Sequence, residues 1–184
     1  MPVAPTFAGR PVRDWIGLLA RLLLGGVLLV AGGLKVGALG ESVVAVRAYL
    51  ILPYEITAFV GYALPLGEIA LGLLLISGLF TRLSAALGGL LMLAFAAAII
   101  SVWARGISLD CGCFGGGGVI DPETAFAAYP WEIARDIGLA AAGAWLVFFP
   151  RTPYSVDGAL SAASPASGLS PHTDHPAAEE LETR

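Results

Sequence analysis

The chain has 184 residues, of which 57% are hydrophobic and only 13% are charged, and its net charge at pH 7 is -4. About 25% of the residues in a soluble globular domain are charged, so this composition argues against a water-soluble protein and favours one surrounded by lipid. The negative net charge gives no basic surface for nucleic acid, and two cysteines are too few for a disulfide-rich scaffold.

The first apolar run follows residues 1–14, a short segment that we expect in the cytoplasm. It extends from Trp15 to Val36, and about 20 apolar residues are enough for a helix to cross the hydrocarbon core. Arg10 and Arg13 precede the run, as in a secretory signal peptide, but the run is longer than a signal's apolar region and lacks a clear cleavage site. We therefore expect an uncleaved first span, whereas a removed signal would leave three spans.

Three further apolar runs are rich in Leu, Ala and Gly and show no alternation typical of strands. Lipid offers no partner for backbone N–H and C=O groups, so these runs are expected to be helices. Their small residues suit close packing of helices within one bundle. The sequence thus predicts an all-α protein whose residues 15–150 form an antiparallel bundle of four transmembrane helices. The spans are expected at about residues 15–36, 57–80, 83–103 and 131–149.

The connections between the spans differ in length and composition. Residues 78–82 predict a tight turn, and the stretch from Glu41 to Leu52 predicts a short amphipathic helix. The loop of residues 104–130 is rich in glycine and contains both cysteines. Residues 151–184 are rich in Ser, Ala, Pro and acidic residues, so we expect them to form a disordered cytoplasmic tail.

The distribution of arginine predicts the orientation in the membrane, because short cytoplasmic loops carry an excess of basic residues. The outer side would carry Arg47 and Arg105, with Lys35 at a helix end. This pattern favours a multi-pass protein of the cell membrane with both termini in the cytoplasm and the cysteine loop outside. The basic residues expected on the cytoplasmic side are Arg10, Arg13, Arg82 and Arg151.

The cysteine loop contains a Cys-Gly-Cys motif formed by Cys111, Gly112 and Cys113. A disulfide between such close residues closes a small strained ring, and strained, exposed disulfides are the ones that exchange electrons. We favour a redox pair at these cysteines. A static bridge, two free structural thiols and a metal site remain as alternatives. Zinc requires four ligands, and only His172 and His175, in the tail, could add soft donors, so we expect no metal.

Several charged residues fall within or close to the predicted spans. Charges inside a membrane are costly, so they usually pair and often mark function. Arg21 and Glu68 are expected to form an ion pair, which we interpret as structural. Lys35, Arg135 and Asp136 fall toward the outer side, where they could line a polar pocket beside the cysteines. That group could form a proton or quinone site that receives electrons from the cysteines, or a structural ion pair.

These motifs together resemble the DoxX-like superfamily and, more specifically, its MauE branch. The shared features are the four-span architecture, Arg21 to Gly25, Gly33-Leu34-Lys35, Leu64-Pro65 with Glu68, Leu109 to Gly115, and Arg135-Asp136. The resemblance covers about residues 15–149 and leaves out the tail. It implies a redox-associated membrane protein of the kind found in methylamine utilisation, where MauE is thought to help mature a disulfide-rich subunit outside the cytoplasm.

We therefore predict a thiol–disulfide electron relay that supports disulfide formation or protein maturation outside the cytoplasm. Cys111 and Cys113 would cycle between disulfide and dithiol through mixed disulfides, as a thiol–disulfide oxidoreductase does. The partners would be a thioredoxin-like protein and a membrane carrier such as quinone. The alternative is a non-enzymatic assembly or scaffold subunit whose loop is a docking surface. A small transporter is weaker, because no internal repeat is evident.

Overall fold

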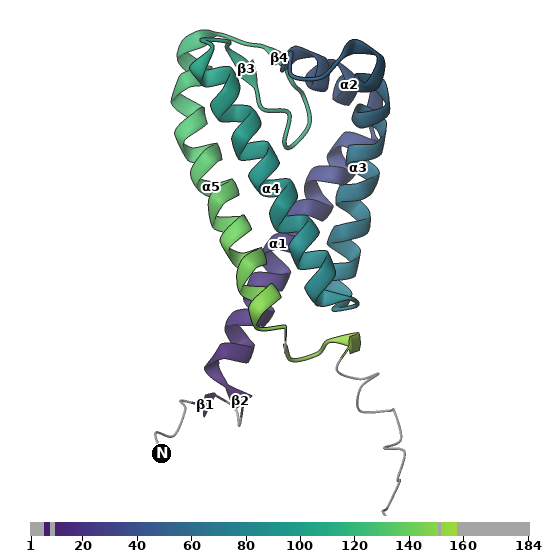
Figure 1. Ribbon diagram of the computed structural model, residues 1–184, viewed down its shortest axis with the longest axis vertical. Coiled ribbons are helices and arrows are strands. Elements are labelled where there is room, and N and C mark those ends of the chain that lie inside the picture. The colour runs from purple at the N-terminus through teal and green to yellow at the C-terminus, as the bar shows by residue number, and fades with distance from the viewer. Residues whose placement is uncertain (1–5, 8–9, 151, 158–184) are drawn as a thin grey trace, which may run out of the picture.

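A computed structural model describes residues 6–7, 10–150 and 152–157 of the chain, and its core is a bundle of long helices (Figure 1). Two short antiparallel strand pairs flank the helices, β1 with β2 near the N-terminus and β3 with β4 at the opposite end of the bundle. The strands are β1 (Thr6–Phe7), β2 (Arg10–Pro11), β3 (Leu109–Asp110) and β4 (Gly118–Val119). The helices are α1 (Val12–Val36), α2 (Leu39–Ala48), α3 (Tyr54–Ser77), α4 (Thr81–Ala104) and α5 (Pro122–Phe148).

Three helices of the described chain, α1, α3 and α4, are long and apolar enough to cross a membrane. They correspond to the first three predicted spans. The fifth helix has 27 residues, which corresponds to a length of about 40 Å. It carries Glu132, Arg135 and Asp136 within the stretch predicted to be the fourth span. The domain is therefore mostly helical, as predicted, with the short β3–β4 pair as an addition, whereas the count of four spans stays a prediction.

The fifth helix starts earlier than the sequence analysis expected. It begins at Pro122 rather than near Trp131, so the predicted loop of residues 104–130 is shorter than proposed. The carboxylate of Asp121 accepts a hydrogen bond from the backbone N–H of Thr124 at 3.1 Å. An Asp at the N-cap followed by Pro at the first helical position is a strong start signal for a helix. This local signal lies outside the apolar run, so the run alone predicts too late a start for the helix.

Small residues bring neighbouring helices into close contact, as predicted. A Cβ atom added at Gly32 of α1 would lie 2.7 Å from the backbone oxygen of Pro65 in α3. Gly72 of α3 approaches the backbone of α1 as closely, and Gly143 of α5 would place a Cβ 2.9 Å from the backbone oxygen of Ala85 in α4. No side chain fits at these contacts, so glycine fixes the register of both helix pairs.

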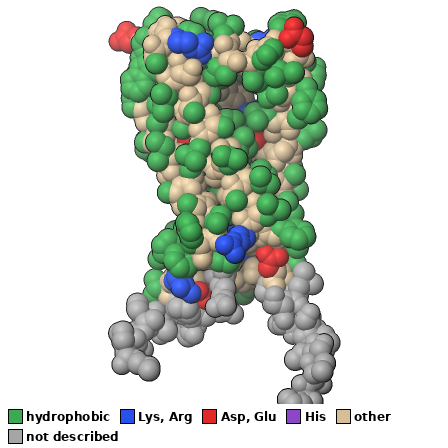
Figure 2. All heavy atoms as spheres, viewed as in Figure 1, with side chains coloured by type: hydrophobic (Ala, Val, Ile, Leu, Met, Phe, Trp, Pro, Cys, Tyr) green, Lys and Arg blue, Asp and Glu red, His purple; other side chains and the backbone are tan. Residues whose placement is uncertain are grey.

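Large apolar side chains cover the outer surface of the bundle. Leu19, Phe59, Leu66, Leu90 and Phe148 are each more than half exposed. In the space-filling view, hydrophobic side chains spread over the whole visible face, while most visible charged side chains gather toward its two ends (Figure 2). A surface with an apolar middle and charged ends matches a bilayer with its hydrocarbon core and polar interfaces.

The predicted disorder of residues 151–184 is wrong for residues 152–157. Thr152 is buried against the bundle. The carboxylate of Asp157 accepts hydrogen bonds from the backbone N–H groups of Phe80 and Thr81, at 2.9 and 2.8 Å, where α4 begins. Composition predicted disorder here, but Asp157 accepts hydrogen bonds from the first backbone N–H groups of α4, which would otherwise lack partners. Residues 158–184, with His172 and His175, lie outside the described residues.

Candidate functional site

The two cysteines lie on a hairpin that folds back into one end of the bundle. Strands β3 and β4 pair antiparallel, with Leu109 opposite Val119, and the chain between them turns inward toward α2 (Figure 1). Gly112 has a φ of 65° and Gly117 a φ of 103°. Residues other than glycine rarely adopt such positive φ angles. Ala45 of α2 leaves no room for a Cβ atom at Gly117. The glycine run thus permits both the turn and its close contact with α2.

Two tyrosines hold the hairpin in place. The hydroxyl of Tyr129, a residue only 1% exposed, accepts a hydrogen bond from the N–H of Leu109 at 2.8 Å and lies 3.0 Å from the carbonyl oxygen of Ile107. The hydroxyl of Tyr49 donates to the carbonyl oxygen of Cys111 at 2.9 Å. Neither tyrosine was among the residues that the sequence predicted for the site. Their only signal was a polar-tipped aromatic beside an amphipathic or apolar stretch, which does not specify a partner.

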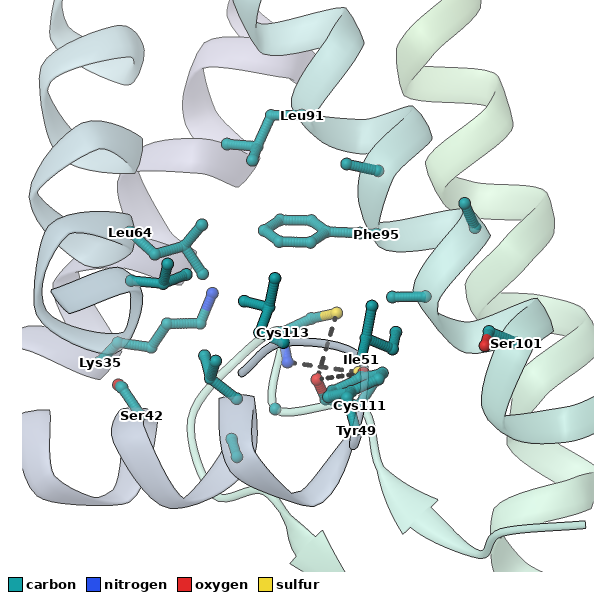
Figure 3. Close-up of a pocket in the computed structure, with 18 residues that line it drawn as sticks. Lys35, Ser42, Tyr49, Ile51, Leu64, Leu91, Phe95, Ser101, Cys111 and Cys113 are labelled. Carbon is teal, nitrogen blue, oxygen red and sulfur yellow. Dashed lines mark hydrogen bonds between the residues drawn. The ribbon is translucent and has the colours of Figure 1, made fainter. Parts of the chain in front are cut away.

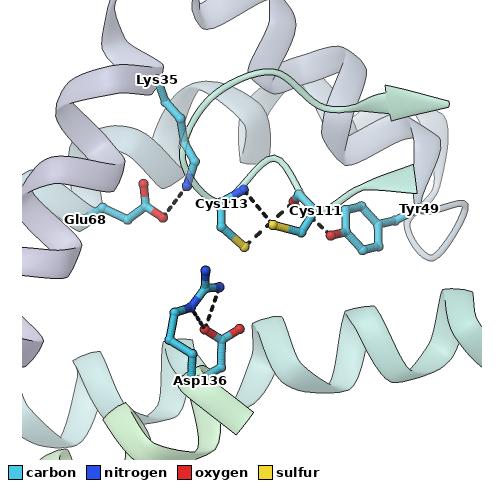
Figure 4. Close-up of polar contacts among 7 residues, drawn as sticks. Lys35, Tyr49, Glu68, Cys111, Cys113 and Asp136 are labelled. Carbon is cyan, nitrogen blue, oxygen red and sulfur yellow. Dashed lines mark hydrogen bonds and ion pairs between the residues drawn. The ribbon is translucent and has the colours of Figure 1, made fainter. Parts of the chain in front are cut away.

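The cysteines are close together and are not joined by a disulfide. Cys113 is 7% exposed, whereas Cys111 is partly accessible. The N–H of Cys113 donates to Sγ of Cys111 at 3.3 Å, and Sγ of Cys113 lies 3.9 Å from the carbonyl oxygen of Cys111 (Figure 4). The fold thus leaves Cys111 partly accessible and buries Cys113 almost completely.

The surroundings of the two thiols move their pKa values in opposite directions. A hydrogen bond with the side chain of Cys111 lowers the pKa of Cys113, and the positive charges of Arg135 and Lys35 act in the same direction against burial and Asp136. That same hydrogen bond, together with burial, raises the pKa of Cys111. Cys113 is therefore the cysteine favoured as a thiolate, and Cys111 is favoured as its thiol partner.

A buried ion pair flanks the cysteines on the side of α1 and α3. Nζ of Lys35 lies 2.6 Å from Oε1 of Glu68, and the two side chains are 5% and 0% exposed (Figure 4). The predicted pairing of Arg21 with Glu68 is wrong. The contact of Gly32 with Pro65 sets the register of the antiparallel helices and brings Glu68 opposite the end of α1. Arg21 lies about four helical turns away from Lys35 along α1.

Arg21 instead belongs to the opposite end of the bundle. Its guanidinium donates to Oγ1 of Thr152 at 2.7 Å and to the carbonyl oxygen of Tyr154 at 3.1 Å. The side chain is 2% exposed, so these two acceptors compensate for its burial. Arg21 therefore does not belong to the group of residues around the cysteines. It holds the segment of residues 152–157 against the bundle.

The remaining predicted pair lies on α5, on another side of Cys113. Nη2 of Arg135 is 2.8 Å from Oδ1 of Asp136, and the Arg135 guanidinium lies 5.0 Å from the centre of the Phe114 ring. Figure 4 shows the carboxylate of Asp136 directed toward the region between Cys113 and α5. Lys35, Glu68, Arg135 and Asp136 therefore lie around the buried cysteine, but only Lys35 lines the cavity, and a role for the group as a polar pocket stays a prediction.

A cavity of about 530 Å³ opens beside the cysteines (Figure 3). It lies between α3 and α4 and is bounded by α2 and the cysteine hairpin, and the space-filling view shows a hollow near this end (Figure 2). Most of its lining is apolar. The side chains that bring polar atoms or sulfur to it are those of Lys35, Ser42, Tyr49, Ser101, Cys111 and Cys113.

The family profile described as "Methylamine utilisation protein MauE" matches residues 13–149. The chain belongs to the MauE family. Neither the curated proteins nor the solved structures give a significant match. The family match confirms the resemblance drawn from the motifs, and it spans α1 to α5 with all the residues that surround the cysteines.

The described part of this MauE-family chain contains no group of three or more His, Cys, Asp or Glu side chains that could hold a metal ion. The site offers instead two thiols of unequal accessibility, one buried and one partly buried ion pair, and a mostly apolar cavity. Such an arrangement can form and break a disulfide and can stabilise a thiolate beside a space that excludes water.

Proposed function

We propose that this MauE-family membrane protein is a thiol–disulfide relay, in which Cys111 exchanges with an extracytoplasmic partner and Cys113 is the buried leaving group. The observation that carries the proposal is the division between the two sulfurs. Cys111 is the more accessible, and the pKa of Cys113 is lowered by its hydrogen bond with Cys111 and by Arg135 and Lys35. Thiol–disulfide exchange is faster when the departing sulfur is a stable thiolate.

The exchange starts from the disulfide between Cys111 and Cys113. A thiolate of the partner attacks Sγ of Cys111, a partner–Cys111 bond forms, and Cys113 leaves with the electron pair as a thiolate. The second thiol of the partner then attacks the mixed disulfide and releases Cys111, which takes up a proton. The partner ends with a disulfide and this chain with two thiols, so two electrons have entered the membrane protein. A thioredoxin-like protein presents the required pair of thiols.

Capture of a mixed disulfide tests which sulfur meets the partner. The Cys113→Ser and Cys111→Ser chains, each with one remaining cysteine, are activated with an aromatic disulfide reagent. Each is then offered a thioredoxin that keeps only its attacking cysteine. We expect Cys113→Ser to form the mixed disulfide about tenfold faster, because Cys111 is accessible and Cys113 is buried. Equal rates, or no capture by either chain, would contradict the relay and favour a scaffold role that is independent of the cysteines.

The proposed orientation has both termini in the cytoplasm and α5 as the fourth span. The support is the length of α5 and its packing along α4 (Figure 1), which together would make α5 a fourth crossing and return the chain to the side of its N-terminus. A membrane-impermeant maleimide applied to intact cells should label Cys111, with a chain lacking both cysteines as the control. Labelling that appears only after the cells are broken would show that the loop faces the cytoplasm.

A further inference from the structure

The cavity beside the cysteines has the size and the lining of a binding site for an apolar ligand. Its volume of about 530 Å³ lies within the range of small-molecule sites, about 300–1,000 Å³. Leu64 of α3 and Leu91 and Phe95 of α4 point into it, and Cys113 lies at the same space (Figure 3). A ligand here would contact hydrocarbon over most of its surface and would reach the buried sulfur.

The position of the cavity favours entry of a ligand from lipid. The cavity lies between α3 and α4, two candidate membrane spans whose ribbons diverge toward the end that carries α2 (Figure 1). Ala94 and Ala97 of α4 line the cavity and are exposed, and so is Ile51, which follows α2. A molecule that enters between two membrane spans comes from the bilayer, so this position favours a lipid-soluble ligand.

Two polar groups inside the cavity lack part of their hydrogen bonding. Ser42 is 6% exposed, and its hydroxyl has no hydrogen-bond partner among the described residues. Lys35 lines the same cavity and donates one hydrogen bond to Glu68, although an ammonium group can donate three. Unsatisfied buried donors are costly, and both groups suit a ligand with a carbonyl oxygen. An acyl chain alone would leave them unsatisfied.

We propose that this cavity binds the head group of a lipid-soluble quinone, which accepts the two electrons of the Cys111–Cys113 dithiol. The proposal rests on the relay function and names its electron acceptor. Lys35 and Ser42 orient a quinone oxygen, and Cys113 faces the ring from the wall of the cavity. The tail of the quinone leaves between α3 and α4 into the bilayer.

The redox step balances without any further reactant. The Cys113 thiolate adds to the quinone ring through its sulfur, and the Cys111 sulfur then attacks Sγ of Cys113. The S–S bond forms while the bond from Cys113 to the ring breaks, and the electron pair stays with the ring. Two protons, one from each original thiol, end on the two quinone oxygens. The dithiol is oxidised to a disulfide, and the quinone is reduced to a hydroquinone.

The test follows reduction of decylubiquinone by the full-length purified chain, with dithiothreitol as the electron donor. The wild-type chain should be at least about tenfold faster than a chain in which both cysteines are serine. Ala98→Phe, which fills the cavity from α4, should lower the rate to about that of the double-serine chain. The matched control Leu90→Phe adds the same ring at an exposed position of α4 outside the cavity, and it should stay within about twofold of wild type.

A wild-type chain no faster than the double-serine chain would overturn the proposal, and so would an Ala98→Phe chain as fast as wild type. If Ala98→Phe does not fold, labelling by a photoreactive ubiquinone analogue tests whether the quinone binds in the cavity. It should label Leu64, Leu91 or Phe95 in the double-serine chain, and labelling confined to other residues refutes the site. If the chain exchanges with thioredoxin but reduces no quinone, the relay proposal stands and the quinone proposal is refuted. If the chain captures no thioredoxin, the relay proposal itself is refuted.

Discussion

At the scale of single residues, the packing of α1 against α3 decides which basic side chain pairs with Glu68. Arg21 and Lys35 are both on α1, and either could in principle reach Glu68. The choice depends on the register between α1 and α3, which the contact of Gly32 with Pro65 sets. No single-helix pattern contains that register. Arg21 finds its acceptors in Thr152 and Tyr154, which composition had assigned to a disordered tail.

The buried Lys35–Glu68 pair yields a prediction for stability. Removing one member of a buried ion pair leaves an uncompensated charge and costs about 3–5 kcal/mol. We therefore expect Glu68→Gln and Lys35→Met each to lower the free energy of unfolding by about 3 kcal/mol in a detergent-unfolding titration.

The double variant provides the control for this prediction. Lys35→Met combined with Glu68→Gln removes both charges, so it should lose less than the sum of the two single losses. Additive losses would show that the charges do not interact. A Glu68→Gln chain that is as stable as wild type and loses only thiol turnover would instead assign Glu68 a role in the reaction.

At the scale of elements, the apolar runs predicted α1, α3 and α4 well. In lipid, a single apolar segment can pair its backbone N–H and C=O groups only by forming a helix. The amphipathic stretch of Glu41 to Leu52 predicted α2, whose observed bounds are Leu39–Ala48. The hairpin was predicted only as a glycine-rich loop. Its inward fold depends on contacts with α2 and with Tyr129, which are distant in sequence and carry no local pattern.

The contact between the hairpin and α2 predicts a specific effect of Gly117→Ala. The new Cβ would collide with Ala45, and the φ of 103° is strained for any residue but glycine, at a cost of about 1–3 kcal/mol. We expect the hairpin to move outward and Cys113 to become several-fold more reactive toward iodoacetamide, measured by mass spectrometry of the labelled peptide. Gly40→Ala is the matched control, since that position has open space in α2. Unchanged labelling in Gly117→Ala would mean that the hairpin does not depend on this contact.

At the scale of the whole molecule, the two ends of the bundle are organised differently. One end carries the cysteine hairpin, the cavity and two ion pairs, of which Lys35–Glu68 is buried and Arg135–Asp136 partly buried. At the other end, the chain returns after α5 and joins α1 to the α3–α4 turn through Arg21, Thr152 and Asp157. This segment ties α1 to the start of α4 at the end of the bundle opposite the cavity.

Replacement of Asp157 tests that connection and its dependence on pH. Burial raises the pKa of Asp157, but hydrogen bonds from the backbone of Thr81 and Phe80 outweigh it, and the pKa ends below its ordinary value. A carboxylate with a lowered pKa in the folded chain stabilises the fold above its unfolded pKa of about 3.9, and that contribution is lost as the pH falls through the folded pKa. Asp157→Ala should therefore lower the free energy of unfolding by about 1 kcal/mol at pH 7, the usual cost of losing a helix cap. The difference from wild type should persist to about pH 4 and shrink below it. Asp157→Asn keeps an acceptor at the helix start, so its free energy of unfolding should fall less. If Asp157→Ala loses the same free energy of unfolding at pH 7 and pH 3, the carboxylate charge does not stabilise the contact with α4.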